Sequence, residues 1–76
     1  MAELVDYLAR GLVENSDEVR VTETGTPDRV SVRLDVAEGD WGKVIGRQGR
    51  VATALRTMVK VAAVQEDCRA NLEIGD

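Results

Sequence analysis

Residues 42–51 read Gly42-Lys43-Val44-Ile45-Gly46-Arg47-Gln48-Gly49-Arg50-Val51, and this stretch decides the fold. Its glycines at positions 46 and 49 predict a tight turn, because glycine adopts positive φ and has no Cβ to block an approaching molecule. The run that follows has helical spacing, so the turn should end at a helix N-terminus. The unpaired N–H groups and the positive end of the helix dipole found there are typical of a phosphate-binding turn.

Polar side chains in or beside this turn would present three cations and one amide donor: Lys43, Arg47, Gln48 and Arg50. Charge along the chain points to the same place. Residues 41–65 hold five cations and no acid, net +5, whereas the rest of the chain holds five cations and fourteen acids, net −9, which together give −4. An acidic remainder would repel polyanions from the other surfaces. An ordinary helix corner with solvated charges is the alternative, and it accounts for Arg56 and Lys60 better than for the turn.

Other chemistries do not fit the sequence. The glycines at 42, 46 and 49 do not make G-x-G-x-x-G, and Gly42-Lys43 lacks the Ser/Thr and the upstream glycine of a P-loop. The chain contains no histidine, which excludes Cys/His catalysis and histidine-based metal sites. The single cysteine, Cys68, is interpreted as a small apolar strand residue. We therefore predict no catalytic residues, no cofactor and no metal.

The segments before the turn predict a helix and a hairpin. Residues 2–13 carry one apolar stripe at helical spacing, formed by Leu4, Val5, Leu8 and Leu12. Alternating β-branched residues predict strands over 18–24 and 30–36, and Pro27 fixes the bend of the turn at 24–28. The strands should pair antiparallel, with one buried face that is formed in the second strand by Val30, Val32, Leu34 and Val36.

A short helix is expected over residues 41–45, with Asp40 as its N-cap. Val44 and Ile45 would anchor this helix in the core. Trp41 has two interpretations: it covers the edge of the sheet or of a helix, or it lies at a groove or subunit contact, where aromatic residues are enriched.

A long helix is expected from Arg50 to about Gln65. Its core-facing stripe is predicted to be Val51, Leu55, Met58, Val59 and Ala62. Further apolar residues widen this surface beyond what one sheet face needs: Ala54, Val61 and Val64. They indicate either a partner surface or wide burial within the monomer, and both remain open. A last strand follows, over residues 68–74.

Length and composition predict one domain over residues 1–76 with a thin core, because a chain this short buries only a little over about 60% of the surface that its unfolded form exposes. Neither a leader nor an apolar run near the membrane-spanning length is present, so we expect a soluble, cytoplasmic protein without a membrane partner. Three amphipathic strands need one layer of helices over their apolar face. This predicts a two-layer α+β fold.

The element order αββααβ, with Gly46-Arg47-Gln48-Gly49 between the fourth and fifth elements, resembles the type II, or prokaryotic, arrangement of the KH family of nucleic-acid-binding domains. The resemblance covers essentially the whole chain, and the chain is most similar to the small stand-alone bacterial proteins of the KhpA type. It implies a three-stranded sheet covered on one face by three helices. It also implies a GxxG loop that clamps the backbone of about four nucleotides.

By this resemblance, Gly46 to Gly49 are the backbone clamp, and the expected RNA-binding residues are Lys43, Val44, Ile45, Gly46, Arg47, Gln48, Gly49 and Arg50. Val44, Ile45 and Val51 would flank the groove, and the second strand, near residues 32–36, would form its other wall. The implied function is single-stranded RNA binding in the cytoplasm, as an RNA chaperone or post-transcriptional regulator. The implied assembly is a homodimer, or a heterodimer with a second KH-containing protein. The alternative is a protein-interaction adaptor that uses the fold mainly to dimerise.

Overall fold

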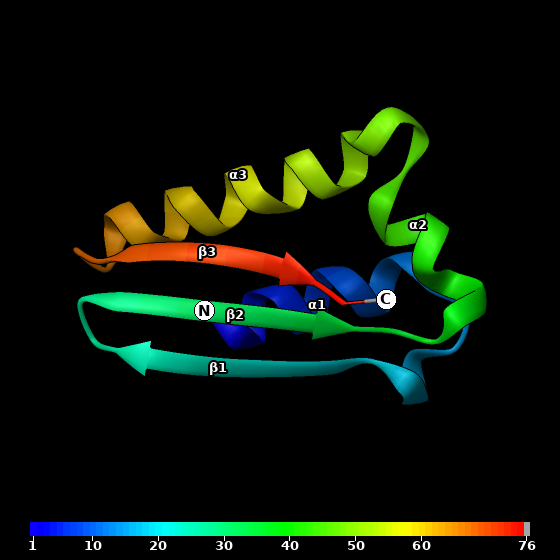
Figure 1. The fold of residues 1–76 in the computed structure, drawn as a ribbon, viewed down its shortest axis with the longest axis horizontal. Helices are drawn as coiled ribbons and strands as arrows, with labels where there is room; N and C mark the ends of the chain where they lie inside the picture. The colour runs from blue at the N-terminus through cyan, green and yellow to red at the C-terminus, as the bar shows by residue number, and fades with distance from the viewer. Residues whose placement is uncertain (76) are drawn as a thin grey trace.

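The computed structural model describes residues 1–75. Within this range it contains three α-helices, three strands and three short 3₁₀ turns. Their bounds in chain order are α1 (Ala2–Leu12), η1 (Ser16–Glu18), β1 (Arg20–Thr26), β2 (Arg29–Asp35), η2 (Glu38–Asp40), α2 (Trp41–Ile45), η3 (Arg47–Gly49), α3 (Arg50–Gln65) and β3 (Arg69–Ile74). Figure 1 shows this path from the blue N-terminal helix to the red last strand. The predicted element order is confirmed, and the predicted bounds of α2 and α3 match those of the structure.

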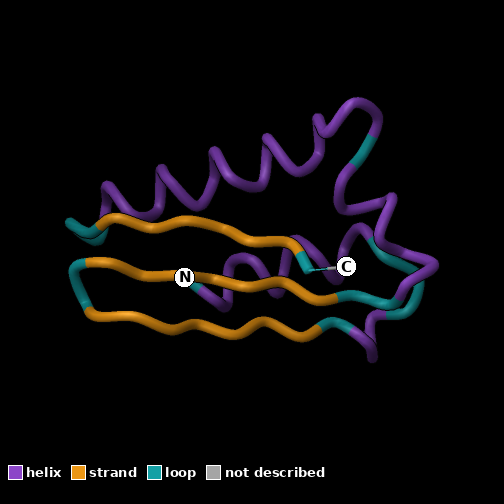
Figure 2. Tube along the Cα trace, in the orientation of Figure 1, coloured by secondary structure: helices purple, strands orange, loops and turns teal. Residues whose placement is uncertain are grey.

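The strands form one mixed sheet in the order β1-β2-β3. β1 and β2 pair antiparallel as the predicted hairpin, whereas β3 lies parallel to β2 on its other side. Figure 2 shows the three strands side by side, with α3 running above β3. The long connection from β2 to β3, through α2 and α3, is what allows the two strands to be parallel.

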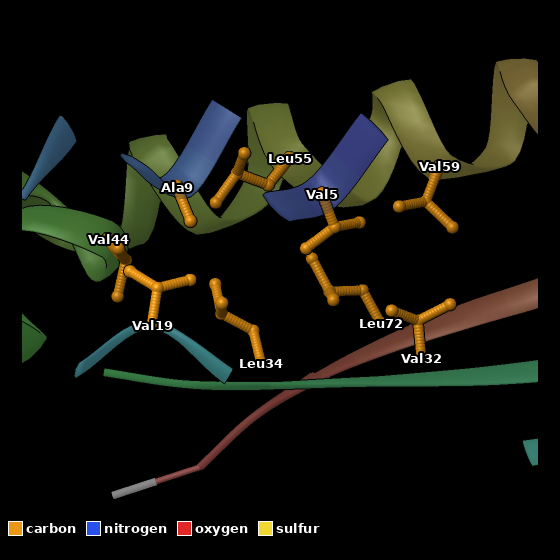
Figure 3. Packing of buried hydrophobic residues seen from close by; sticks show 9 residues of the cluster. All are labelled: Val5, Ala9, Val19, Val32, Leu34, Val44, Leu55, Val59 and Leu72. Carbon is orange, nitrogen blue, oxygen red and sulfur yellow. The ribbon is translucent and has the colours of Figure 1, made fainter. Parts of the chain in front are cut away.

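The helices bury one face of this sheet, which confirms the two-layer α+β fold. The core is aliphatic: Val5, Ala9, Val19, Val32, Leu34, Val44, Leu55, Val59 and Leu72. In Figure 3 these side chains fill the space between the helices and the strands. The opposite face of the sheet is exposed and polar, because the side chains of each strand alternate between the two faces.

Four local expectations differ from the structure. β1 runs from Arg20 to Thr26 rather than over 18–24, because residues 16–18 form a 3₁₀ turn and a two-residue turn at Pro27 and Asp28 suffices to reverse the chain. Cys68 is half-buried but lies one residue before β3. Met58, expected in the core stripe of α3, has 42% of its surface exposed, and the buried positions of that helix are Ala52, Leu55, Val59 and Ala63. The fourth, the expected cap at Asp40, is described with the site.

Among the helices of residues 1–75, none has the length and apolar character needed to cross a membrane.

Candidate nucleic-acid interface

The turn between α2 and α3 is built from three residues with positive φ. Gly46 has φ 77° and ψ 173°, Gln48 has φ 58° and ψ 26°, and Gly49 has φ 73° and ψ 14°. Such angles suit glycine and are uncommon for other residues, so Gly46 and Gly49 lie where the backbone requires glycine. The positive φ of Gln48 was not predicted, because a glutamine carries no sequence signal for this conformation.

The two glycines face different surroundings. A Cβ placed on Gly46 would lie 2.8 Å from the backbone nitrogen of Val51 and would collide with the Val51 side chain. A Cβ on Gly49 would meet nothing within 4 Å. Gly46 is therefore required by internal packing, whereas Gly49 leaves open space at the surface.

The turn is fixed to the rest of the molecule on both sides. Val44 in α2 is fully buried in the core beneath the turn, as predicted, and Ile45 and Val51 are half-buried beside it. The Thr53 hydroxyl in the first turn of α3 donates a hydrogen bond of 2.9 Å to the Gly49 carbonyl. Thr53 was not among the predicted site residues, although a threonine four residues after a helix cap is placed for this bond.

The predicted polar side chains of the site divide into two groups. The side chains of Arg47, Gln48 and Arg50 are exposed, so they can reach a ligand in solvent. Lys43 instead bonds within the protein: its Nζ lies 2.9 Å from Glu14 Oε1 and 3.5 Å from Asp40 Oδ1. The hydrogen bond with Glu14 raises the pKa of Lys43 above its ordinary value, and the charges of Glu14 and Asp40 act in the same direction, against partial burial. A phosphate would compete with these carboxylates for Lys43.

Asp40 is the buried charged residue at the base of the site, with 1% of its surface exposed. Its carboxylate accepts hydrogen bonds from the backbone N–H groups of Glu14 (3.2 Å) and Asn15 (2.9 Å), and from the Asn15 side-chain amide (3.1 Å). The bond from the Asn15 N–H is the main cause that lowers the pKa of Asp40, with Glu14 and Lys43 adding to it against the opposing effect of burial. Asp40 thus ties α2 to the chain that follows α1.

The predicted capping role of Asp40 is therefore wrong for its side chain, which makes no cap hydrogen bond to α2. Residues 38–40 already form a 3₁₀ turn that runs directly into α2, so the helix needs no side-chain cap of this kind. The carboxylate is free to turn toward Asn15. This pairing spans 25 positions of sequence and has no local signal.

The second strand does not form an open wall beside the turn, contrary to the expectation for residues 32–36. β2 is the central strand, and Val32 and Leu34 are buried beneath the helices with at most 1% of their surface exposed. The strand edge next to α3 belongs to β3. There the Arg56 Nε donates a hydrogen bond of 3.3 Å to the Leu72 carbonyl. The open edge beside the turn therefore combines the cationic side of α3 with the backbone of β3.

A separate apolar groove of about 670 Å³ runs between α1 and α3. Tyr7 and Leu12 line it from α1, and Ala54, Leu55 and Met58 line it from α3. Met58 is exposed because α1 does not reach over this side of α3, and Val61 and Val64 farther along the helix are exposed as well. Of the two interpretations of the wide apolar surface of α3, burial within the monomer is thus wrong for Val61 and Val64. Trp41, at the start of α2, is 39% exposed.

A mixed three-stranded sheet with three helices on one face, and a glycine-bracketed turn between two of them, defines this chain as a KH domain of the type II order. Comparison with protein families agrees, because the model for "KhpA/KhpB, KH domain" matches residues 2–74. The chain therefore belongs to the KhpA/KhpB family of KH-domain proteins.

Its relatives are similar over nearly their whole length. The chain is 49% identical over 74 residues to the RNA-binding protein KhpA of Caldanaerobacter subterraneus subsp. tengcongensis, which covers 97% of this chain and 99% of the relative. It is 40% identical over 76 residues to the RNA-binding protein KhpA of Bacillus subtilis, which covers 100% of this chain and 94% of the relative. No solved structure matches the chain significantly.

Proposed function

We propose that this protein binds single-stranded RNA by clamping its phosphate backbone at the turn from Gly46 to Gly49, and that it acts by binding rather than by catalysis. The observation that carries the proposal is the turn itself: an exposed, left-handed corner that leads directly into the N-terminus of α3. The RNA-binding relatives named KhpA support the choice of RNA as the ligand. Of the residues expected from the resemblance, Lys43 and Gly46 to Arg50 are proposed to contact RNA, whereas Val44 and Ile45 support the turn from within the protein.

The chemistry follows from this geometry. Gly49 has open space at its α-carbon, so a phosphate can approach the backbone N–H groups at the start of α3 closely. Arg47 and Arg50 supply exposed positive charge beside it. Lys43 adds a further positive charge once a phosphate displaces Glu14 from its ion pair with Lys43. Val44 and Ile45 act by holding the turn in position.

We expect weak, salt-sensitive binding with little sequence discrimination. The chain has one Trp, one Tyr and no Phe, and stacking of a base on an aromatic ring is worth about 1–3 kcal/mol. Most of the affinity must then come from phosphate contacts, which weaken as salt rises. Such binding suits a cytoplasmic RNA chaperone or post-transcriptional regulator that contacts many transcripts.

The test is a titration of fluorescently labelled single-stranded RNA with wild type and Gly49→Asp. A carboxylate at Gly49 would point into open space and repel phosphate. Gly39→Asp is the matched control, because a Cβ there also meets nothing within 4 Å and the charge change is the same. We expect at least a tenfold loss for Gly49→Asp and almost none for Gly39→Asp. Equal affinity for both folded variants would contradict the clamp.

A second candidate function, a dimerising adaptor, is favoured by the apolar surface on α1 and α3. Tyr7 is 77% exposed, Val61 is 55% exposed, and Met58 lies at the rim of the groove between the helices. A second copy, or another KH-containing protein, would remove these side chains from water. Two linked copies would also raise the apparent affinity for one RNA through avidity.

Sedimentation of wild type and Val61→Glu tests this assembly, with Thr57→Glu as a control at an exposed polar position of the same helix. We expect wild type and Thr57→Glu to dimerise and Val61→Glu to be monomeric. A wild-type protein that stays monomeric at high concentration would refute self-association, and mixing with a second KH protein would then test the heterodimer.

A further inference from the structure

The open face of the sheet is polar along all three strands. Its outward side chains are Arg20, Thr22, Thr24 and Thr26 in β1, Arg29, Ser31, Arg33 and Asp35 in β2, and Arg69, Asn71 and Glu73 in β3. None of them is aliphatic or aromatic. This face therefore differs from the apolar groove on the opposite side of the molecule.

Positive charge gathers on this face although the chain as a whole is acidic. Five cations lie outside residues 41–65, and four of them, all but Arg10, point outward from the open face. The two acids of the face, Asp35 and Glu73, are both bonded by Arg33, at 3.2 Å and 3.3 Å. Four cations and two acids leave the face with a net charge of +2, against −4 for the chain.

Between β2 and β3, the outward side chains at one pair of opposite positions carry like charges. Ser31 faces Asn71 and bonds it at 3.0 Å, and Arg33 faces Glu73 and bonds it at 3.3 Å. Arg29, in contrast, faces Arg69. Like charges on paired residues are unfavourable, and within residues 1–75 neither arginine has an ion pair.

The two arginines share a shallow hollow of about 270 Å³ with Ser31 and Asn71. Of the described residues that line it, none is acidic; on their other side, at the end of the sheet, the same two arginines line a second hollow together with Asp28 and Asp67. An anion seated between Arg29 and Arg69 would turn their repulsion into attraction. Hydroxyl and amide groups beside two guanidinium groups are the groups that proteins direct at phosphate oxygens.

We propose that the end of the open sheet face that carries Arg29 and Arg69 is a second phosphate-contact surface for single-stranded RNA, an inference that rests on the proposed RNA binding. A nucleic acid fits this face better than a protein does. Protein interfaces have an apolar, aromatic-enriched centre, whereas nucleic-acid interfaces are polar and positively charged. Without an aromatic residue to stack on bases, the surface would contact RNA independently of sequence.

The Arg29–Arg69 pair lies far from the turn. Arg29 and Arg69 begin β2 and β3 at one end of the molecule, and the turn from Gly46 to Gly49 lies near the other end of its 34 Å long axis (Figure 1). We therefore expect a four-nucleotide RNA at the turn not to reach Arg29 and Arg69. A longer RNA can occupy both surfaces, or two RNA segments can be held on one domain.

The experiment compares labelled oligouridines of about four and about twenty nucleotides, titrated with the full chain at several salt concentrations. Arg29→Gln and Arg69→Gln each remove one positive charge from the open face. Arg10→Gln is the matched control, because it removes the same charge from α1, where Arg10 bonds Asp6. Gly49→Asp reports on the turn.

For the long RNA, we expect Arg29→Gln and Arg69→Gln each to weaken binding about threefold and to reduce the slope of log affinity against log salt by about 0.7, the change for one lost phosphate contact on a single strand. Both sheet variants should bind the short RNA with wild-type affinity. Arg10→Gln should bind both RNAs with wild-type affinity. Thermal midpoints should be unchanged or slightly higher, because each substitution removes a like-charge contact.

Three results would overturn the proposal: wild-type affinity of both sheet variants for the long RNA, an equal loss for short and long RNA, or competition by polyglutamate as effective as that by RNA of equal charge. Loss of binding in the sheet variants with wild-type binding by Gly49→Asp would instead refute the clamp at the turn and support the sheet surface. The two proposals therefore fail separately.

Discussion

Alanine at Gly46 should destabilise the protein far more than alanine at Gly49, although both glycines have φ near +75°. Gly49, at ψ 14°, is in the left-handed helical region, which an L-residue enters at a cost of about 1–2 kcal/mol. Alanine also lowers the conformational entropy of the unfolded chain, which stabilises the folded protein by about 0.4–1 kcal/mol. The net expectation for Gly49→Ala is a loss of about 1 kcal/mol.

Gly46, at ψ 173°, is in a region that is essentially restricted to glycine and costs other residues about 1–3 kcal/mol. The new Cβ would also lie 2.8 Å from the Val51 backbone nitrogen. That atom belongs to the first turn of α3 and cannot move without shifting the helix, and such overpacking costs about 1–3 kcal/mol more. With the same unfolded-state gain as for Gly49→Ala, we therefore expect Gly46→Ala to lose about 3 kcal/mol.

Urea unfolding followed by circular dichroism measures this difference. For a domain of this size the dependence of stability on urea is about 1 kcal/mol per molar, so the midpoints of the two variants should differ by about 2 M. The slopes should be equal. Equal midpoints at equal slopes, or a lower midpoint for Gly49→Ala, would show that the turn in solution differs from the one described.

Three further predictions concern the base of the site and the core. Asp40→Asn should lower the free energy of unfolding near neutral pH. Because folding lowers the pKa of Asp40, the carboxylate stabilises the fold fully above its unfolded pKa, near 4. In acid titrations, the stability difference between variant and wild type should shrink as the pH falls below that value. Glu14→Gln should lower the pKa of Lys43, measured by NMR, and tighten binding of single-stranded RNA about twofold by freeing that side chain. Leu34→Ala should cost about 3 kcal/mol in urea unfolding, because Leu34 is fully buried, whereas Met58→Ala should cost less than about 1 kcal/mol.

Sequence reasoning located the turn and the bounds of the helices on either side of it because their signals are local. Glycines at 46 and 49 interrupt the helical pattern, and apolar spacing from Arg50 to Gln65 fixes which side of α3 faces the sheet. The alternation in β2 likewise placed Val32 and Leu34 inward. Each of these signals depends on residues within a few positions of one another.

Tertiary structure alone decided how far each buried face extends and which distant groups meet. Met58 is exposed because the position of α1 sets the limit of the covered surface on α3, and no pattern within α3 contains that position. Asp40 bonds Asn15, and Arg29 faces Arg69, across 25 and 40 positions of sequence. Helical and strand periodicity specify a direction for each side chain, but the partner found in that direction depends on how separate elements pack together.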